Sequence, residues 1–184
     1  MTTSISIREA GVDDVAALSA IGHASFRAAY ENWSEPDDLV AHLEGFFSEV
    51  AIRAAMGSPG CCYLLALNGD EAVGFTKIRE GAQPDEIPVA RALELHQVYV
   101  MPDQQRFGVG GRLIDAATRY AHEQSADGVW LSVWEDAPWA VNCYRKYGFE
   151  QVGTMDFKLG QAIYNDLVMW RPFTAQKSES RSPS

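Results

Sequence analysis

Alternation of apolar and polar residues predicts strands along most of the chain. Residues 4–8 alternate, with Ile5 and Ile7 on one side, which indicates a first strand because successive strand side chains point to opposite faces. Two apolar runs, 62–67 and 72–78, flank Asn-Gly-Asp-Glu and predict a hairpin, since Asn-Gly tolerates the positive φ angles of a tight turn. Further strands are expected over 93–100, 129–134, 149–157 and 163–170.

Helical periodicity fills the stretches between these strands. Residues 12–30 begin with acidic residues and repeat apolar residues at helical spacing, which predicts the first helix. Glu35 opens a Glu-Pro-Asp-Asp start signal, and the apolar residues after it predict a second helix. Helices are also expected over 110–124 and from Pro138 onwards, with Gly148 in the left-handed position after the helix end. The predicted order is β-α-α-β-β-β-α-β-α-β-β.

Composition places this pattern in one domain. A chain of 184 residues, 47% hydrophobic and 22% charged, can bury one sizeable core. We expect a domain over 1–173 and a disordered tail over 174–184, which is rich in Ser, Lys and Arg. The N-terminus lacks a basic region followed by an apolar core, and no apolar run approaches the ~18 residues of a membrane span. We therefore expect a soluble, cytoplasmic protein with no membrane partner and with its three cysteines reduced.

The charge of the chain narrows its partners. Fifteen basic and 25 acidic residues give a formal net charge of −10, and a field of that sign repels nucleic acid while it attracts cations. A cationic amine is favoured as a substrate, although acidic composition also serves solubility alone. The four histidines are scattered without ligand spacing, so no metal site is expected.

The stretch from Gln105 to Arg112 (QRFGVGGR) lies between a predicted strand and an amphipathic helix. A helix N-terminus leaves backbone N–H groups without intrahelical partners and carries partial positive charge, so glycines that allow close approach make it a pyrophosphate cradle. A dinucleotide fingerprint needs a third glycine where this chain has Leu113, and no mononucleotide P-loop occurs. NAD and ATP are therefore disfavoured.

Two motifs resemble the GNAT family of N-acetyltransferases. The spacing Gln105-x-x-Gly108-x-Gly110 resembles the family's acetyl-CoA pyrophosphate loop, and the block YRKYGF, which begins at Tyr144, resembles the Y-x-K-x-G-F signature that closes its last helix. The resemblance covers nearly the whole chain. It implies an α/β (α+β) fold, a mixed and mostly antiparallel sheet of about seven strands with helices on both faces. One departure is Ala137, where the family commonly has an asparagine that contacts the cofactor.

Acetyl transfer to an amine requires both a proton acceptor and a proton donor. A lysine-like amine, with a pKa near ~10.4, attacks a thioester only after losing a proton, and the departing thiolate benefits from an acid. The resemblance implies that this acid is Tyr144. Glu94 and His96 are expected on one strand face, where Glu94, through water, or His96, directly, would take the amine proton.

The resemblance also assigns the two binding regions. The helical region resembles bacterial spermidine/spermine acetyltransferases, which places Tyr30 and Trp33 on the acceptor together with Glu94, the aromatic rings through cation–π contacts. The expected acetyl-CoA contacts are the backbones of Val98, Tyr99 and Val100, the loop residues Gln105, Arg106, Phe107, Gly108, Val109, Gly110, Gly111 and Arg112, and Lys146.

We therefore predict an N-acetyltransferase that moves the acetyl group of acetyl-CoA to a small cationic, polyamine-like amine by direct attack in a ternary complex. Two alternatives stay open. A protein lysine or N-terminal acetyltransferase would bind a peptide instead, and a non-catalytic acyl-CoA-binding module would not need Tyr144. The acyl length, the acceptor and the oligomeric state, a homodimer included, are not set by the sequence.

Overall fold

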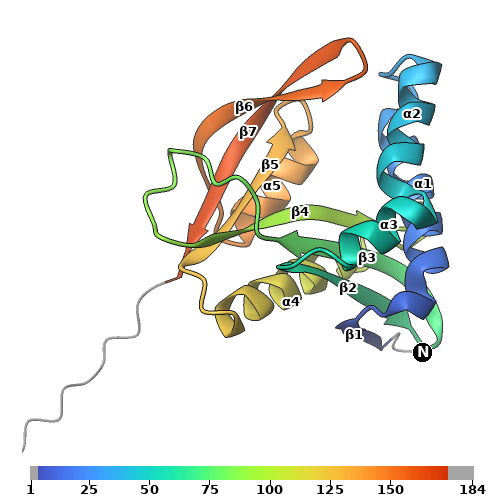
Figure 1. The fold of residues 1–184 in the computed structure, drawn as a ribbon, viewed down its shortest axis with the longest axis horizontal. Coiled ribbons are helices and arrows are strands. Elements are labelled where there is room, and N and C mark those ends of the chain that lie inside the picture. Colours follow the sequence, from blue (N-terminus) through green and yellow to red (C-terminus); the bar gives the residue numbers. More distant parts are fainter. Residues whose placement is uncertain (1–3, 174–184) are drawn as a thin grey trace, which may run out of the picture.

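A computed structural model describes residues 4–173, so the tail expected at 174–184 lies outside the described residues. Seven strands form one sheet in the order β1-β2-β3-β4-β5-β7-β6 (Figure 1). Neighbouring strands are antiparallel except β4 and β5, which are parallel. This confirms the mixed, mostly antiparallel sheet that the sequence predicts. The strands are β1 (Ile5–Glu9), β2 (Cys61–Asn68), β3 (Glu71–Arg79), β4 (Ala92–Val100), β5 (Gly128–Trp134), β6 (Glu150–Leu159) and β7 (Ala162–Pro172).

The helices differ from the prediction in one respect. Three helices, not two, precede β2, because a third begins directly after the second at Ser48. The extended backbone of Ser48 ends one helix, and its Oγ accepts a hydrogen bond from the Ala51 N–H (3.3 Å) to begin the next. The third helix buries only Ile52, which leaves too little apolar periodicity to detect. The helices are α1 (Val15–Tyr30), α2 (Pro36–Phe47), α3 (Glu49–Met56), α4 (Val109–Glu123) and α5 (Pro138–Lys146), with short 3-10 turns η1 (Val12–Asp14) and η2 (Pro102–Gln104).

Helices cover both faces of the sheet, as Figure 1 shows. Alternate residues of β2 divide between two cores: Cys62 and Leu64 pack with α4 and α5, whereas Tyr63 and Leu65 pack with α1, α2 and α3. The period-two alternation of a buried strand therefore feeds both layers.

Close approach of α1 and α2 depends on a glycine. A Cβ added at Gly22 would overlap the ring of Phe47, which is fully buried. The Ser19 Oγ also donates a hydrogen bond to the Phe47 carbonyl (2.6 Å). Gly22 thus sets the distance at which α2 crosses α1.

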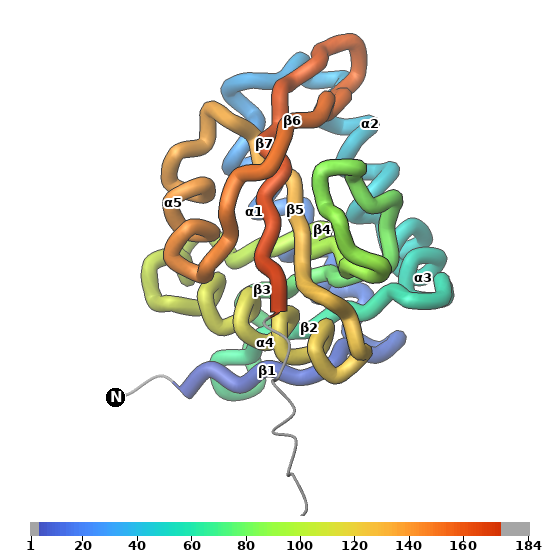
Figure 2. Tube along the Cα trace, turned by 90° about the vertical axis from the view of Figure 1, so that its left-hand side faces the viewer, coloured from blue at the N-terminus to red at the C-terminus, as the bar shows by residue number. Residues whose placement is uncertain are grey.

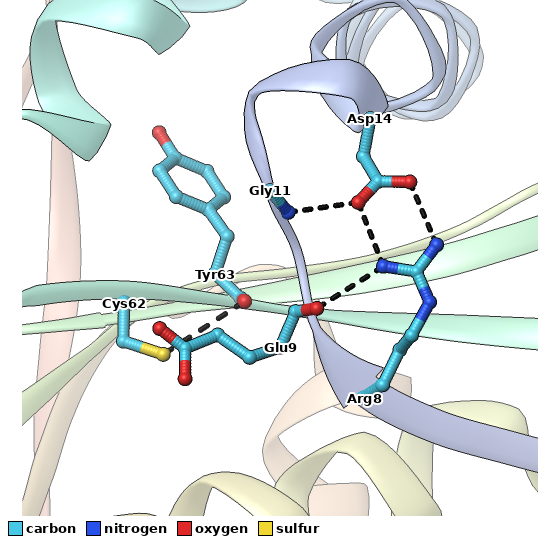
Figure 3. Close-up of polar contacts among 6 residues, drawn as sticks. All are labelled: Arg8, Glu9, Gly11, Asp14, Cys62 and Tyr63. Carbon is cyan, nitrogen blue, oxygen red and sulfur yellow. Dashed lines mark hydrogen bonds and ion pairs between the residues drawn. The ribbon is translucent and has the colours of Figure 1, made fainter.

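The corner between β1 and α1 is fixed by an ion pair (Figure 3). Both terminal nitrogens of Arg8 donate to the Asp14 carboxylate at 2.7 and 2.8 Å, and the Gly11 N–H donates to the same group at 2.8 Å. These bonds lower the pKa of Asp14 to about 2. On the neighbouring strand β2, burial raises the pKa of the Cys62 thiol to about 12, and all three cysteines are free.

The β6–β7 hairpin meets the start of α2. Gly160, with φ +59, lies in the turn of this hairpin, and a Cβ there would overlap the Asp38 carboxylate of α2. The Tyr164 hydroxyl of β7 donates to the Trp33 carbonyl (3.1 Å), just before α2. Figure 1 shows the hairpin tip beside this helix end.

Candidate active site

An opening in the sheet lies between β4 and β5. The two strands pair only where 92–94 meets 128–130, and beyond Glu94 they diverge (Figure 1). The second half of β4 therefore pairs with β3 on one side and faces the opening on the other. The register turns the backbone groups of Val98 and Val100 towards the opening, whereas those of Tyr99 pair with Phe75 of β3. The Val100 carbonyl already accepts from the Ser25 Oγ (3.0 Å), so the Val98 backbone and the Val100 N–H are the groups available to a ligand that enters the opening.

A β-bulge sets which side chains of β4 face the opening. Lys77 pairs with Gln97 and Ile78 pairs with Leu95, so His96 has no partner on β3. Because of this extra residue, Leu95 and Val98 both pack towards α4, and Tyr99 packs towards α1 and α2. Glu94 and His96 line the same cavity, where the sequence places them together.

This cavity measures ≈ 520 Å³ and crosses the opening. Its walls come from α1, α2 and strands β3 to β7, with α5 at one end. Figure 2 shows that β5 and β7 lie side by side, between α5 and the loop before β4. Aromatic rings dominate one region, where Phe26 stacks on Tyr30 (4.4 Å) and on His42 (4.2 Å). Tyr144 lines the other region, close to the free edge of β4.

The glycine loop between β4 and α4 leaves the helix N-terminus open. Gly108 caps α4 with φ +78, a left-handed conformation that favours glycine, and no side chain caps the helix. A Cβ at Gly108 would meet nothing within 4 Å, and one at Gly110 would meet only Val100, at 3.8 Å. Exposed backbone N–H groups with open space in front of them suit a pyrophosphate.

The two sequence motifs meet in space. A Cβ at Gly111 would overlap the Tyr147 hydroxyl, so this glycine lets α5 end against the start of α4. The exposed Lys146 precedes Tyr147 at the end of α5. The Arg112 side chain donates to the Ile5 carbonyl of β1 (3.0 Å). Only the backbone of Arg112 is therefore left to contact a ligand. Gln105 donates to the Val100 carbonyl (3.2 Å), whereas Arg106 and Phe107 are exposed.

Tyr144 projects from α5 into the cavity. Its ring lies edge-on to Phe149, with centroids 5.9 Å apart, and Phe149 is buried. Burial raises the pKa of Tyr144 well above its usual range, so the phenol keeps its proton at neutral pH. Ala137, in place of the family asparagine, begins α5 and lines the same cavity without a side-chain cap.

The two acceptor candidates on β4 differ in their surroundings. Glu94 is paired across the strands with Arg79, whose Nε donates to Glu94 Oε2 at 2.6 Å. His96 has a buried Nδ1 with no hydrogen-bond partner among residues 4–173. Burial, aided by the positive charges of Arg79 and Lys77, lowers the pKa of His96 to about 3. His96 is therefore neutral at physiological pH.

Sequence reasoning missed Asp166, which lines the cavity from β7. Only 5% of its surface is exposed, and its Oδ1 has no hydrogen-bond partner among the described residues. Burial raises the pKa of Asp166 to about 6, a shift that the Ser132 hydroxyl opposes. An aspartate directly before the apolar run 167–170, inside a predicted strand, was the available signal.

The two aromatic acceptor candidates separate. Tyr30 lines the main cavity, whereas Trp33 lines a second hollow of ≈ 360 Å³ together with Glu35, Asp38 and Tyr164. The rings of Tyr30 and Trp33 lie 6.0 and 5.8 Å from that of Trp134. The Trp134 ring, which lines the main cavity, therefore lies beside both of these rings.

Residues 4–173 contain neither a metal-binding cluster nor a membrane-spanning helix. No cluster of three or more His, Cys, Asp or Glu side chains is arranged to hold a metal ion in this range. None of the helices that the structure describes has the length and apolar character to cross a membrane.

Comparisons with known proteins identify the family of this chain. A model of the acetyltransferase (GNAT) family matches residues 19–149. An uncharacterized N-acetyltransferase encoded in the pepI 3′ region of Lactobacillus delbrueckii subsp. lactis is 27% identical over 169 residues, which cover 91% of this chain and 96% of that protein. An L-methionine sulfoximine/L-methionine sulfone acetyltransferase of Pseudomonas aeruginosa is 27% identical over 153 residues, 83% of this chain and 84% of that enzyme. The PaiA N-acetyltransferase of Thermoplasma acidophilum, solved with coenzyme A, matches with a TM-score of 0.73 and 18% identity, covering 92% of this chain and 99% of that one. The chain therefore belongs to the acetyltransferase (GNAT) family and is an acetyl-CoA-dependent N-acetyltransferase.

Proposed function

We propose that this enzyme acetylates a small, positively charged primary amine by direct attack in a ternary complex. The observation that carries the proposal is the continuity of the cavity, which joins the Tyr144 region to an aromatic acceptor region. Direct attack requires the acetyl donor and the amine to be bound at the same time, and one continuous space allows this.

On the donor side, the proposed contacts come mainly from backbone. The N–H groups at the start of α4 and the space in front of Gly108 and Gly110 suit the pyrophosphate of acetyl-CoA. The free edge of β4 suits the amide-bearing pantetheine arm. Lys146 supplies a positive charge at the nearby end of α5.

For the chemistry, Tyr144 is the proposed proton donor to the leaving thiolate. A phenol that burial keeps protonated can give its proton to the sulfur as the carbon–sulfur bond breaks. Glu94 and His96 lie on the acceptor side of the same cavity, where the amine enters. Either group can hydrogen-bond the incoming nitrogen, Glu94 while held by Arg79 and His96 through its free Nδ1.

A cationic acceptor fits the aromatic walls. Rings such as Phe26, Tyr30 and Trp134 stabilise an ammonium group through cation–π attraction. The second hollow, lined by Trp33, carries the carboxylates of Glu35 and Asp38, which suit a second, distal ammonium. A polyamine-like acceptor, which carries two ammonium groups, would therefore occupy both the main cavity and the second hollow.

A peptide acceptor is the alternative, and one observation favours it. The exposed apolar side chains of Phe46, Trp139 and Met155 line the cavity, and exposed apolar surface of this kind suits another protein. Asp38 and the turn of the β6–β7 hairpin meet at the second hollow, and this closed end favours a small molecule. The similar Pseudomonas enzyme is named for two amino-acid derivatives, which are also small amines.

A turnover screen tests the proposal. Purified protein would be given acetyl-CoA with spermidine, benzylamine, methionine sulfone, an aminoglycoside, or peptides with a free N-terminus or a lysine. Product should be detected by mass spectrometry, because the three free cysteines interfere with thiol reagents. We expect the cationic small amines to have the highest kcat/KM. Efficient acetylation of peptides alone would establish the alternative, and coenzyme binding without any turnover would indicate a non-catalytic module.

A further inference from the structure

We propose that Asp166 binds the ammonium group of the acceptor and takes a proton from it. The inference rests on the proposed function and adds the residue that recognises the charge of the substrate. It also moves the proton-accepting role from β4 to β7, the strand between β5 and β6 in the sheet.

The position of Asp166 is the first support. It pairs with Trp134 on β5 and with Met155 on β6, and all three residues line the cavity. Its carboxylate is almost completely shielded from solvent, yet Oδ1 has no hydrogen-bond partner among residues 4–173. A buried carboxylate oxygen without a partner is costly, and a bound N–H donor would remove that cost.

The charges around the cavity are the second support. Its lining includes two carboxylates, and Arg79 already neutralises Glu94. The two lining histidines are neutral at physiological pH, because burial lowers the pKa of His42 to about 4 and that of His96 to about 3. Asp166 is therefore the carboxylate of this cavity for which the described residues provide no cation, and a cationic ligand can supply it.

The groups that face Asp166 suit an ammonium ion. Tyr30 of α1 is the titratable side chain whose charge couples to Asp166, and burial, with smaller contributions from Asp166 and Tyr164, raises the pKa of Tyr30 to about 12. On β5 the facing groups are Ser132 and Trp134, which do not titrate. The Trp134 ring lies 6.0 Å from Tyr30 and 5.8 Å from Tyr164. Ring faces and one carboxylate form a site for a single positive charge.

The proposed proton path balances. The ammonium group gives one proton to the Asp166 carboxylate and becomes a neutral amine. Its nitrogen bonds to the acetyl carbon while the carbon–sulfur bond breaks, and the thiolate takes the Tyr144 proton. The nitrogen then returns its extra proton to Tyr144, and Asp166 releases the first proton to solvent. Burial raises the pKa of Asp166 to about 6, which makes it a better proton acceptor than an ordinary carboxylate while most of it stays ionised at neutral pH.

Asp166→Asn tests this role, because it removes the charge and keeps the shape. Asp156→Asn is the matched control, since Asp156 is an exposed aspartate on the adjacent strand β6. Benzylamine and spermidine would serve as charged acceptors, and benzoic hydrazide, whose terminal nitrogen is uncharged at neutral pH, as a neutral one. We expect Asp166→Asn to lower kcat/KM for both charged amines by about 10²-fold or more at pH 7. The loss should be much smaller for the hydrazide, and coenzyme A affinity should stay unchanged.

Two measurements keep the test independent of turnover. Calorimetry in the presence of coenzyme A should show benzylamine binding to the native protein and to Asp156→Asn, but not to Asp166→Asn. The melting temperature of the free Asp166→Asn protein should exceed that of the native protein at pH 7 and match it at pH 4, because the variant removes a buried charge only where that charge exists. Unchanged amine binding in Asp166→Asn, or a lower melting temperature at pH 7, would overturn the inference. A native protein that binds benzylamine through Asp166 yet acetylates no amine would refute the proposed function and the proton transfer to Asp166, and would leave only its role in binding the ammonium group.

Discussion

Arg79 donates from Nε to Oε2 of Glu94 over 2.6 Å, as a cross-strand pair on β3 and β4. The Glu94 side chain is 9% exposed, so the pairing neutralises a carboxylate that is largely removed from water. The Glu94 carboxylate, which the sequence suggests as a proton acceptor, is thus already paired with Arg79 in the folded protein. Glu94 shapes the acceptor region as half of a neutral pair.

Breaking this pair should lower stability. Glu94→Gln leaves a partly buried guanidinium without its anion, and we expect a loss of about 1–3 kcal/mol in urea unfolding. In a double-mutant cycle with Arg79→Gln, the coupling should reach ~1 kcal/mol, against about 0.3–0.5 kcal/mol for the exposed pair Arg53–Glu49. If Glu94→Gln instead slows turnover at neutral pH and recovers at alkaline pH, where free amine is plentiful, Glu94 is the proton acceptor.

Tyr144→Phe should reduce kcat by about 10²- to 10⁴-fold at saturating acetyl-CoA, because it removes the proposed proton donor. The ring packing on Phe149 is kept, so the melting temperature should change little. Tyr63→Phe is the control, since this buried tyrosine also has an unbonded hydroxyl but lies outside the cavity. Near-native kcat in the Tyr144 variant would assign this residue to packing.

Gly110→Leu should weaken coenzyme A binding without unfolding the protein. The position has room for a side chain, but that side chain would fill the space in front of the α4 N-terminus. Loss of one charge-assisted backbone bond to phosphate, about 1.5–3 kcal/mol, predicts at least a tenfold rise in Kd by calorimetry. Gly45→Leu, in open space on α2, should bind coenzyme A normally. Equal affinities would show that the phosphates bind elsewhere.

The neutral His96 should make folding stability depend on pH. Burial lowers its pKa from 6.5 to about 3, so below pH 6.5 the unfolded chain takes up a proton that the folded protein does not. Its contribution is therefore present above pH 6.5 and is lost towards pH 3, with a slope of up to about 1.4 kcal/mol per pH unit. His42, whose pKa is also lowered, likewise makes the protein more stable as the pH rises. Asp166, whose pKa is raised, has the opposite effect and makes the protein less stable as the pH rises from 3.8 to about 6.

Urea titrations between pH 4 and 7 would measure this slope. His96→Gln should flatten it, whereas His122→Gln, which changes an exposed histidine, should leave it unchanged. A slope that is the same in all three proteins would mean that folding does not lower the pKa of His96.

Gly22 and Gly45 form a matched pair on α1 and α2. Gly22→Ala forces a methyl group into the buried Phe47 ring and should cost about 1–3 kcal/mol. Gly45→Ala meets nothing within 4 Å and should stabilise α2 by about 0.5–1 kcal/mol through helix propensity. Denaturant unfolding measures both, and a neutral Gly22→Ala would show that the two helices can separate without loss.

The sequence by itself determined the elements whose signals are local. Asn-Gly places the β2–β3 turn, where Gly69 has φ +62, and Gly148 ends α5 with φ +83. Both features depend on dihedral preferences of a few consecutive residues, which a linear pattern records. The helix α3 was not predicted, because its single buried residue, Ile52, gives no apolar periodicity.

Only the tertiary structure decided which groups meet in the active site. Arg79 reaches Glu94 through the β3–β4 register, and the bulge at His96 determines which residues of β4 face the cavity. Asp166 joins Tyr30 there only after β7 inserts between β5 and β6 and α1 packs over the sheet. Local propensity cannot encode such distances, because they depend on strand pairing between segments far apart in the chain. Burial without a partner, which gives Asp166 its proposed role, exists only in the folded protein.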